Sequence, residues 1–193
     1  MSKEARNRVA QEAARLIVSG AESEYLDAKE RAIMMLGLSS LSCLPTNSKV
    51  KEYILQLTKE ELGVEEVARR LQAMRETALA IMEALSDYDP FLIGSVVTGK
   101  IRDGSDIDIH AYCDSPKQLV SLLSTYGYED LDLEEVENSK GRFFHIKWVE
   151  ELYPVEITVY EWSKRDITPI SSVSGKPMKR LDIRAVKRLV ENC

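Results

Sequence analysis

Residues 91–111 read FLIGSVVTGKIRDGSDIDIHA, and the interpretation of the whole chain rests on them. Asp106 and Asp108 alternate with two isoleucines, and in a β-strand this alternation puts both carboxylates on one face. Two like charges this close repel each other, so the pair is costly unless a cation lies between them. Upstream, Gly94 and Ser95 end an apolar run and can begin a helix whose backbone N–H groups suit a phosphate. The stretch therefore predicts a phosphate-binding turn beside a metal-binding pair of carboxylates, the combination that phosphoryl or nucleotidyl transfer uses.

The composition of the chain predicts a soluble, globular protein. It has 193 residues, of which 44% are hydrophobic and 30% charged, with a net charge of −6 that argues against a polyanion binder as a whole. No apolar run approaches the roughly 20 residues that a membrane span requires, and the charged N-terminus lacks the apolar core of a secretory signal. The three cysteines are far apart and odd in number, which argues against a disulfide framework. We therefore expect a cytoplasmic protein with no membrane partner.

Residues 1–88 are predicted to form a helical domain of unknown role. Apolar residues recur at helical spacing in three segments, and then in a heptad-like rhythm over residues 64–85. Two interpretations of that last segment stay open: one long helix packed inside a small bundle, or the seam of a homodimer. No residue of this half has a catalytic pattern, because its carboxylates lie on polar helix faces. Pro90 disfavours helix in the residue before it, so we place the domain boundary between residues 88 and 89.

Residues 89–193 are predicted to form an α/β domain with a mixed sheet. Short strands are expected at 91–94 and 106–112, followed by a helix over 114–126. Two further strands over 142–149 and 155–161 are joined by a turn, and a helix over about 181–191 completes the domain. The predicted fold class is thus α+β, with an N-terminal helical bundle followed by this α/β domain.

A third carboxylate follows from the same strand periodicity. In residues 155–160 the apolar side chains share one face, and Glu156 lies on the other. If this strand neighbours residues 106–112, Glu156 can approach Asp106 and Asp108. Three carboxylates at one point would hold two Mg²⁺ ions, with Mn²⁺ as an alternative metal. Glu161 is the competing acid if the register differs, and a solvent-facing strand edge also accounts for Glu156.

The chain resembles the DNA polymerase beta-like nucleotidyltransferase superfamily, most of all its small prokaryotic members, the minimal nucleotidyltransferases. The resemblance rests on Gly94-Ser95, on Gly99 five positions after the first glycine, and on the run Ser105-Asp106-Ile107-Asp108. It covers roughly the last 100 residues, and the helical half does not match the superfamily by motif.

The resemblance implies a role for each of the matching residues. Gly94 and Ser95 are expected to hold the nucleotide phosphates, Asp106 and Asp108 to bind both metal ions, and Glu156 to act as third metal ligand and activator of the acceptor.

The chain also departs from the family pattern. Many small members carry Arg where this chain has Thr98, which leaves Lys100 or Arg102 to supply the missing phosphate contact. Ser105, within the matching run, completes the set of nucleotide-binding candidates.

Three functions are compatible with these observations. The first is a metal-dependent nucleotidyltransferase that moves NMP from an NTP, with ATP ranked first, to a hydroxyl of a protein, RNA or small molecule by two-metal in-line displacement. The second is a catalytically weak or inactive nucleotide-binding interaction protein, such as an antitoxin-like partner of a helical protein. The third is nucleic-acid binding through the basic segment 176–188, for which a solvated helix face is the simpler interpretation.

Overall fold

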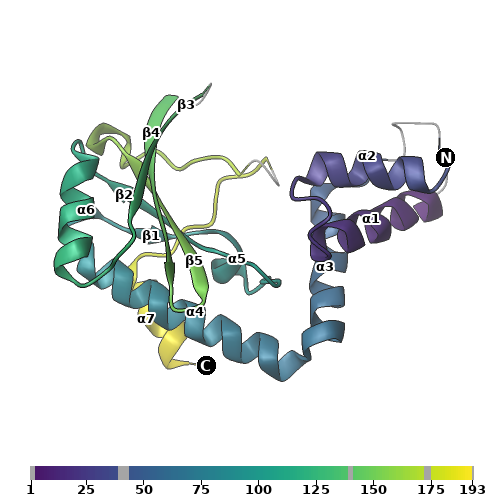
Figure 1. Ribbon diagram of the computed structural model, residues 1–193, viewed down its shortest axis with the longest axis horizontal. Coiled ribbons are helices and arrows are strands. Elements are labelled where there is room, and N and C mark those ends of the chain that lie inside the picture. Colours follow the sequence, from purple (N-terminus) through teal and green to yellow (C-terminus); the bar gives the residue numbers. More distant parts are fainter. Residues whose placement is uncertain (1–2, 39–43, 139–140, 172–174, 193) are drawn as a thin grey trace. The chain divides into compact units, whose positions relative to one another are not determined.

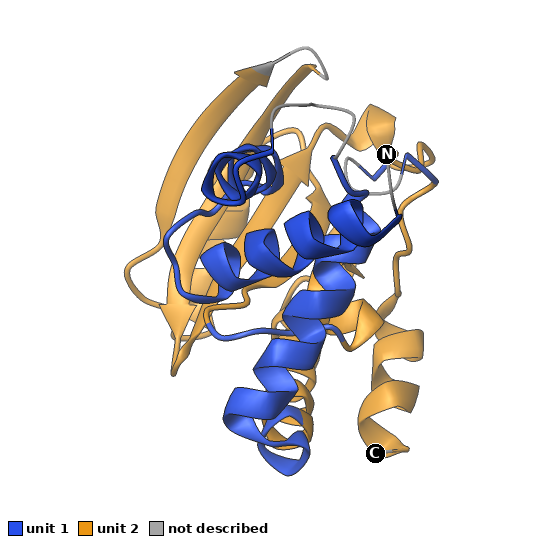
Figure 2. Cartoon of the chain, turned by 90° about the vertical axis from the view of Figure 1, so that its right-hand side faces the viewer, with its two compact units in different colours: residues 1–67, 100–103, 171–176 blue, residues 68–99, 104–170, 177–193 orange. Residues whose placement is uncertain are grey.

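The computed structural model describes residues 3–38, 44–138, 141–171 and 175–192, so that Cys43 and Cys193 lie outside the described residues. Contacts divide the chain into two compact units (Figure 2). The first comprises residues 1–67, 100–103 and 171–176, and the second comprises 68–99, 104–170 and 177–193. The division falls within α4 (Val64–Ala84), so most of this helix belongs to the unit that holds the sheet. The boundary expected between residues 88 and 89 stays a prediction.

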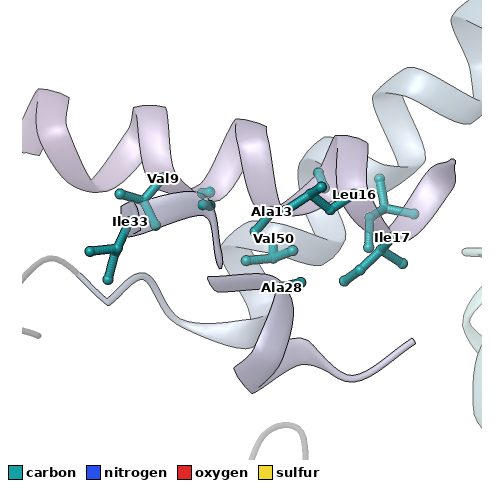
Figure 3. Close-up of a cluster of buried hydrophobic side chains, with 11 residues drawn as sticks. Val9, Ala13, Leu16, Ile17, Ala28, Ile33 and Val50 are labelled. Carbon is teal, nitrogen blue, oxygen red and sulfur yellow. The ribbon is translucent and has the colours of Figure 1, made fainter. Parts of the chain in front are cut away.

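The first unit is built from α1 (Lys3–Val18), α2 (Tyr25–Met35) and α3 (Asn47–Leu62). Thr46 caps α3, because its hydroxyl accepts a hydrogen bond from the backbone N–H of Lys49 at 3.2 Å. The three helices share one apolar cluster (Figure 3), in which alanines of α1 and α2 let the backbones approach closely. Its fully buried members include Val9, Ala10, Ala13, Ala14, Ala28, Ala32 and Val50. The predicted N-terminal helices are confirmed.

The second unit contains a five-stranded sheet of order β1-β2-β5-β4-β3. The strands are β1 (Phe91–Leu92), β2 (Ile107–Tyr112), β3 (Asp132–Asn138), β4 (Gly141–Glu150) and β5 (Tyr153–Tyr160). β2 and β5 pair in parallel, and the other neighbours pair antiparallel. The sheet is therefore mixed, and the predicted α+β class is confirmed.

The helical elements of this unit are α5 (Gly94–Thr98), α6 (Pro116–Thr125), α7 (Ile183–Glu191) and two 3-10 turns, η2 (Ser86–Tyr88) and η3 (Trp162–Lys164). Figure 1 shows α6 along the sheet, with α4 and α7 below it in that view. One face of the sheet is apolar and buried, and it includes Ile107, Ile109, Ile146, Val155 and Ile157. The alternate residues of the same strands turn to the opposite face, which is the more polar one.

The apolar stripe predicted for α4 is largely buried. Met74, Ala78 and Ile81 are at most 2% exposed, whereas Val64 at the start of the helix is 65% exposed and does not join the stripe. The homodimer interpretation of this helix stays a hypothesis.

No helix within the described residues combines the length and the apolar character that a membrane crossing requires.

Candidate active site

Gly94 and Asp108 meet at the edge of the polar sheet face. Gly94 begins α5 directly after β1, and its φ of +75° lies in the left-handed region that favours glycine. A Cβ added at Gly94 would overlap Oδ2 of Asp108 and lie 3.2 Å from its Cγ. A hydrogen bond of 3.0 Å from the backbone N–H of Ile93 to the carbonyl of Asp108 fixes the two segments together. The absent side chain of Gly94 thus provides the space in which the Asp108 carboxylate lies.

Asp108 and Glu156 are direct neighbours on parallel strands. Their Cα atoms are partners in the β2–β5 register, so both side chains lie on the same face of the sheet. Asp108 is half-buried, and Asp106, which comes just before β2, is exposed. The structure therefore brings Asp108, Gly94 and Glu156 to one region of the second unit.

The carboxylate of Glu156 turns towards β4, on the side away from β2. Its Oε1 lies 2.9 Å from Nδ1 of His145, and its Oε2 lies 3.8 Å from Nζ of Lys147. A carboxylate only accepts hydrogen bonds, so Nδ1 of His145 carries the proton in this contact. Thr158 Oγ1 lies 3.4 Å from the same nitrogen. Lys147 has a second partner, Oε2 of Glu134 at 2.9 Å, and this hydrogen bond with the nearby charge raises the pKa of Lys147.

Carboxylate oxygens are the ligands that Mg²⁺ prefers, so the chemical character of Asp106, Asp108 and Glu156 fits such a metal. Among the described residues, however, no group of three or more His, Cys, Asp or Glu side chains lies close enough together to hold a metal ion. The contacts of Glu156 with His145 and Lys147 give a physical reason, since they direct the third carboxylate towards β4 and away from Asp108 on β2. The three-carboxylate metal site stays a prediction.

His110 lies two residues after Asp108 on the same face of β2. It is 3% exposed, and its Nδ1 has no hydrogen-bond partner within the described part of the chain. Burial lowers the pKa of His110 to about 4, and the positive charges of Arg180 and His145 act in the same direction. His110 is therefore a neutral imidazole at pH 7, packed edge-on against the ring of Tyr160 at a centroid distance of 5.0 Å.

Arg180 anchors the basic C-terminal segment to the end of this sheet face. Its Nη1 donates to the hydroxyl of Tyr112 at 2.9 Å, and its guanidinium lies 4.4 Å from the ring centroid of Phe91. Further along the segment, Arg184 and Lys187 are exposed on α7. Nucleic-acid binding by this segment stays a hypothesis.

The predicted phosphate-binding residues fall in both units. Ser95 and Ser105 are half-buried in the second unit, and the carbonyl of Ser95 accepts the N–H of Gly99 that ends α5. Lys100 and Arg102 belong to the segment 100–103, which groups with the first unit. There the charge of Arg102 lowers the pKa of Tyr25, against a larger raising effect of burial. The roles expected for these four residues stay predictions.

His145 and Lys147 were not predicted from the sequence as neighbours of the third acid. Both belong to β4, where they pair with Thr158 and Glu156 across the strands. The signal that could have found them is the register of the β4–β5 hairpin, whose strands are separated only by Glu151 and Leu152.

A known protein family matches the part of the chain that contains the sheet. The family described as "Nucleotidyltransferase domain" matches residues 74–182, which is more than half of the chain. No curated protein matches the chain significantly.

The chain is similar to the solved structure of a cytoplasmic RNA terminal U-transferase, with 17% sequence identity and a TM-score of 0.36. The alignment covers 58% of this chain and 34% of the U-transferase chain. Another similar structure is that of the Cid1 poly(U) polymerase, at 13% identity and a TM-score of 0.34, covering 59% of this chain and 38% of that one. The chain thus spans little more than a third of the length of these structures.

Proposed function

Because the chain belongs to the nucleotidyltransferase domain family, and so to a family of transferases, we propose that it transfers NMP from an NTP to a hydroxyl group. The observation that carries this proposal is the contact between the Gly-Ser turn and the Asp-x-Asp strand. The Asp108 carboxylate occupies the space that a side chain at Gly94 would fill, and Glu156 is its partner on the next strand. Transfer at phosphorus requires a phosphate-binding turn beside metal-binding acids, and the closeness of Gly94 to Asp108 supports such a site.

Each residue of the site has a role in this proposal. Asp106 and Asp108 hold two divalent ions, Mg²⁺ or alternatively Mn²⁺, while Gly94, Ser95 and Ser105 bind the phosphates. Bound Mg²⁺ supplies charge neutralisation on the triphosphate and lowers the pKa of the acceptor hydroxyl. Lys100 and Arg102 are the cations proposed to offset the remaining triphosphate charge.

Glu156 is proposed as the third acid, which completes the ligand set and orients the acceptor hydroxyl. Its contacts impose a condition on that role. To face Asp108, the carboxylate has to give up its hydrogen-bond contact with His145 and its ion pair with Lys147. ATP is the proposed nucleotide, and a protein, an RNA or a small molecule is the proposed acceptor.

Calorimetric titration with ATP and Mg²⁺ tests the nucleotide and metal part of this proposal. We expect Asp106→Asn combined with Asp108→Asn to abolish Mg²⁺-dependent binding, because the amides remove both negative charges and keep the side-chain shape. The matched control is Asp87→Asn combined with Asp166→Asn, which removes two exposed carboxylates of the same unit. Equal binding by the wild type and the Asp106/Asp108 variant would refute the proposal.

The engagement of Glu156 with β4 favours a second candidate, a nucleotide-binding interaction protein with little or no turnover. Incubation with each NTP labelled on its α-phosphate, in a cell lysate with Mg²⁺, separates the two. Label transferred to a product by the wild type, and not by the Asp106/Asp108 variant, supports the transferase. Nucleotide binding without any labelled product, together with copurification of a stoichiometric partner, supports the second candidate.

A further inference from the structure

The first unit contains a basic cavity that no role assigned above uses. The cavity has a volume of about 590 Å³ and lies between the first turns of α1 and α3. Lys3, Arg6 and Lys49 line it, together with the amide of Asn7 and the hydroxyl of Thr46. No acidic residue is among the described residues that line it. Three cations around one concave site, with polar groups that can hydrogen-bond, form an environment that favours an anion.

A second cavity follows along the same two helices. It has a volume of about 140 Å³, and its lining consists of Gln11, Arg15, Tyr53, Gln56, Leu57 and Glu60, so that the charges of Arg15 and Glu60 offset each other there. On α1 the lining residues advance from Lys3 to Arg15, which corresponds to about 18 Å of helix at 1.5 Å per residue. On α3 they advance in the same order, from Thr46 through Tyr53 to Glu60. Among the described residues the two cavities share no lining residue, but they follow one another along the same two helices, and we call them together the α1–α3 groove. Two cavities in succession suit an extended ligand better than a single phosphate.

The charge along the α1–α3 groove is concentrated at its beginning. Arg15 is paired with Glu12 at 3.1 Å, and Lys49 is paired with Glu52 at 3.0 Å. Both pairs are formed three residues apart on exposed helix surface, where ion pairs contribute little and a polyanion can compete for the cation. Tyr53 adds an aromatic ring beside this charge, with Nζ of Lys49 at 4.8 Å from its centroid.

We propose that the α1–α3 groove binds single-stranded nucleic acid, with Lys3, Arg6 and Lys49 on the phosphates and with Tyr53 and the amides of Asn7, Gln11 and Gln56 facing the bases. A basic groove with an aromatic ring and adaptable amides is the composition of sequence-tolerant single-strand sites. This binding does not depend on the proposed transferase activity.

Fluorescence anisotropy of the full chain with a labelled 12-nucleotide single-stranded RNA tests the proposal. The groove variant is Arg6→Gln with Lys49→Gln. The matched variant is Arg184→Gln with Lys187→Gln, which removes the same two charges from the exposed surface of α7. Circular dichroism and thermal unfolding establish that both variants remain folded.

We expect the wild type to bind the RNA with an affinity that falls as salt rises. The groove variant should bind several-fold more weakly, and the slope of log K against log salt should become shallower by about 1.4, since each phosphate contact contributes about 0.7 on a single strand. The α7 variant should bind as the wild type does.

Three results would overturn the proposal. Loss of binding in the α7 variant, with the groove variant unaffected, would assign the RNA to the C-terminal segment. Displacement of the RNA by ATP at stoichiometric concentration would assign the groove to a free nucleotide. Equal displacement by polyglutamate of matched charge would show that the groove recognises acidic protein as well as it recognises phosphodiesters.

Discussion

The contact between Gly94 and Asp108 predicts a large effect of a single added methyl group. In Gly94→Ala the alanine has to keep the backbone φ of +75° that Gly94 has, and its Cβ overlaps Oδ2 of Asp108. Left-handed backbone costs a non-glycine residue about 1–2 kcal/mol. Forcing a group into occupied space adds about 1–3 kcal/mol. We therefore expect Gly94→Ala to lower the free energy of unfolding by about 3 kcal/mol, and to weaken nucleotide binding because Asp108 is displaced.

Gly127→Ala separates the two contributions. Gly127 also has a positive φ, +90°, but a Cβ there meets no atom within 4 Å. This variant should show only the backbone cost of about 1–2 kcal/mol, and it should bind nucleotide as the wild type does. Urea unfolding measures both free energies, and calorimetry with ATP and Mg²⁺ measures binding.

A double-mutant cycle identifies the colliding group. In an Asp108→Ala background, the only one that remains of the three atoms nearest to the methyl group at position 94 is Cβ of residue 108, at 3.4 Å, which is an ordinary contact. The cost of Gly94→Ala should then fall to that of Gly127→Ala, with a coupling of about 1 kcal/mol or more between the two positions. If Gly94→Ala costs no more than Gly127→Ala in the presence of Asp108, the close approach on which the site rests is wrong.

Three further predictions concern the same unit. The pKa of His110 in the folded state is about 4, below its ordinary value of 6.5, so the unfolded state takes up a proton first as pH falls. The free energy of unfolding should therefore fall by at most about 3 kcal/mol as pH drops from 6.5 to 4. Urea unfolding without divalent metal measures this loss, which should be smaller in His110→Gln. Arg180→Lys keeps the charge but loses the planar contact with Phe91 and the fixed hydrogen bond to Tyr112, and thermal unfolding should show a loss of about 1 kcal/mol; an unchanged midpoint would contradict this. Asp182→Ala removes the cap whose Oδ1 accepts from the N–H of Ala185 at 2.8 Å, and should cost about 1 kcal/mol, with Asp182→Ser close to the wild type.

Local periodicity was sufficient to predict the strands that carry the acids. Alternation around Asp108 and Glu156 assigned both side chains to polar strand faces, because each inference needs only neighbouring residues. That these strands are adjacent depends on tertiary packing, and it was predicted only as a condition, whereas their parallel direction was not predicted. The register shows that the condition holds.

The neighbours of Glu156 could not be predicted without the exact turn between β4 and β5. We expected strands over 142–149 and 155–161, whereas β4 ends at Glu150 and β5 begins at Tyr153, so that only two residues connect them. A hairpin with a two-residue turn fixes every cross-strand pair, and a shift by one residue moves each side chain to the other face. The sequence could therefore predict His145 and Lys147 as neighbours of Glu156 only if the length of the turn was known.

Glu156 lies between Asp108 on β2 and Lys147 on β4, and the two candidate functions differ in which of these strands its carboxylate faces. The carboxylate and its β4 partners are 31%, 16% and 43% exposed, for Glu156, His145 and Lys147 respectively, and ion pairs at such exposure contribute about 0–1 kcal/mol each. A divalent cation beside two carboxylates offers a larger Coulomb energy than either pair. The contacts with β4 therefore cost little to break, and a divalent ion bound at Asp108 would draw the Glu156 carboxylate away from β4.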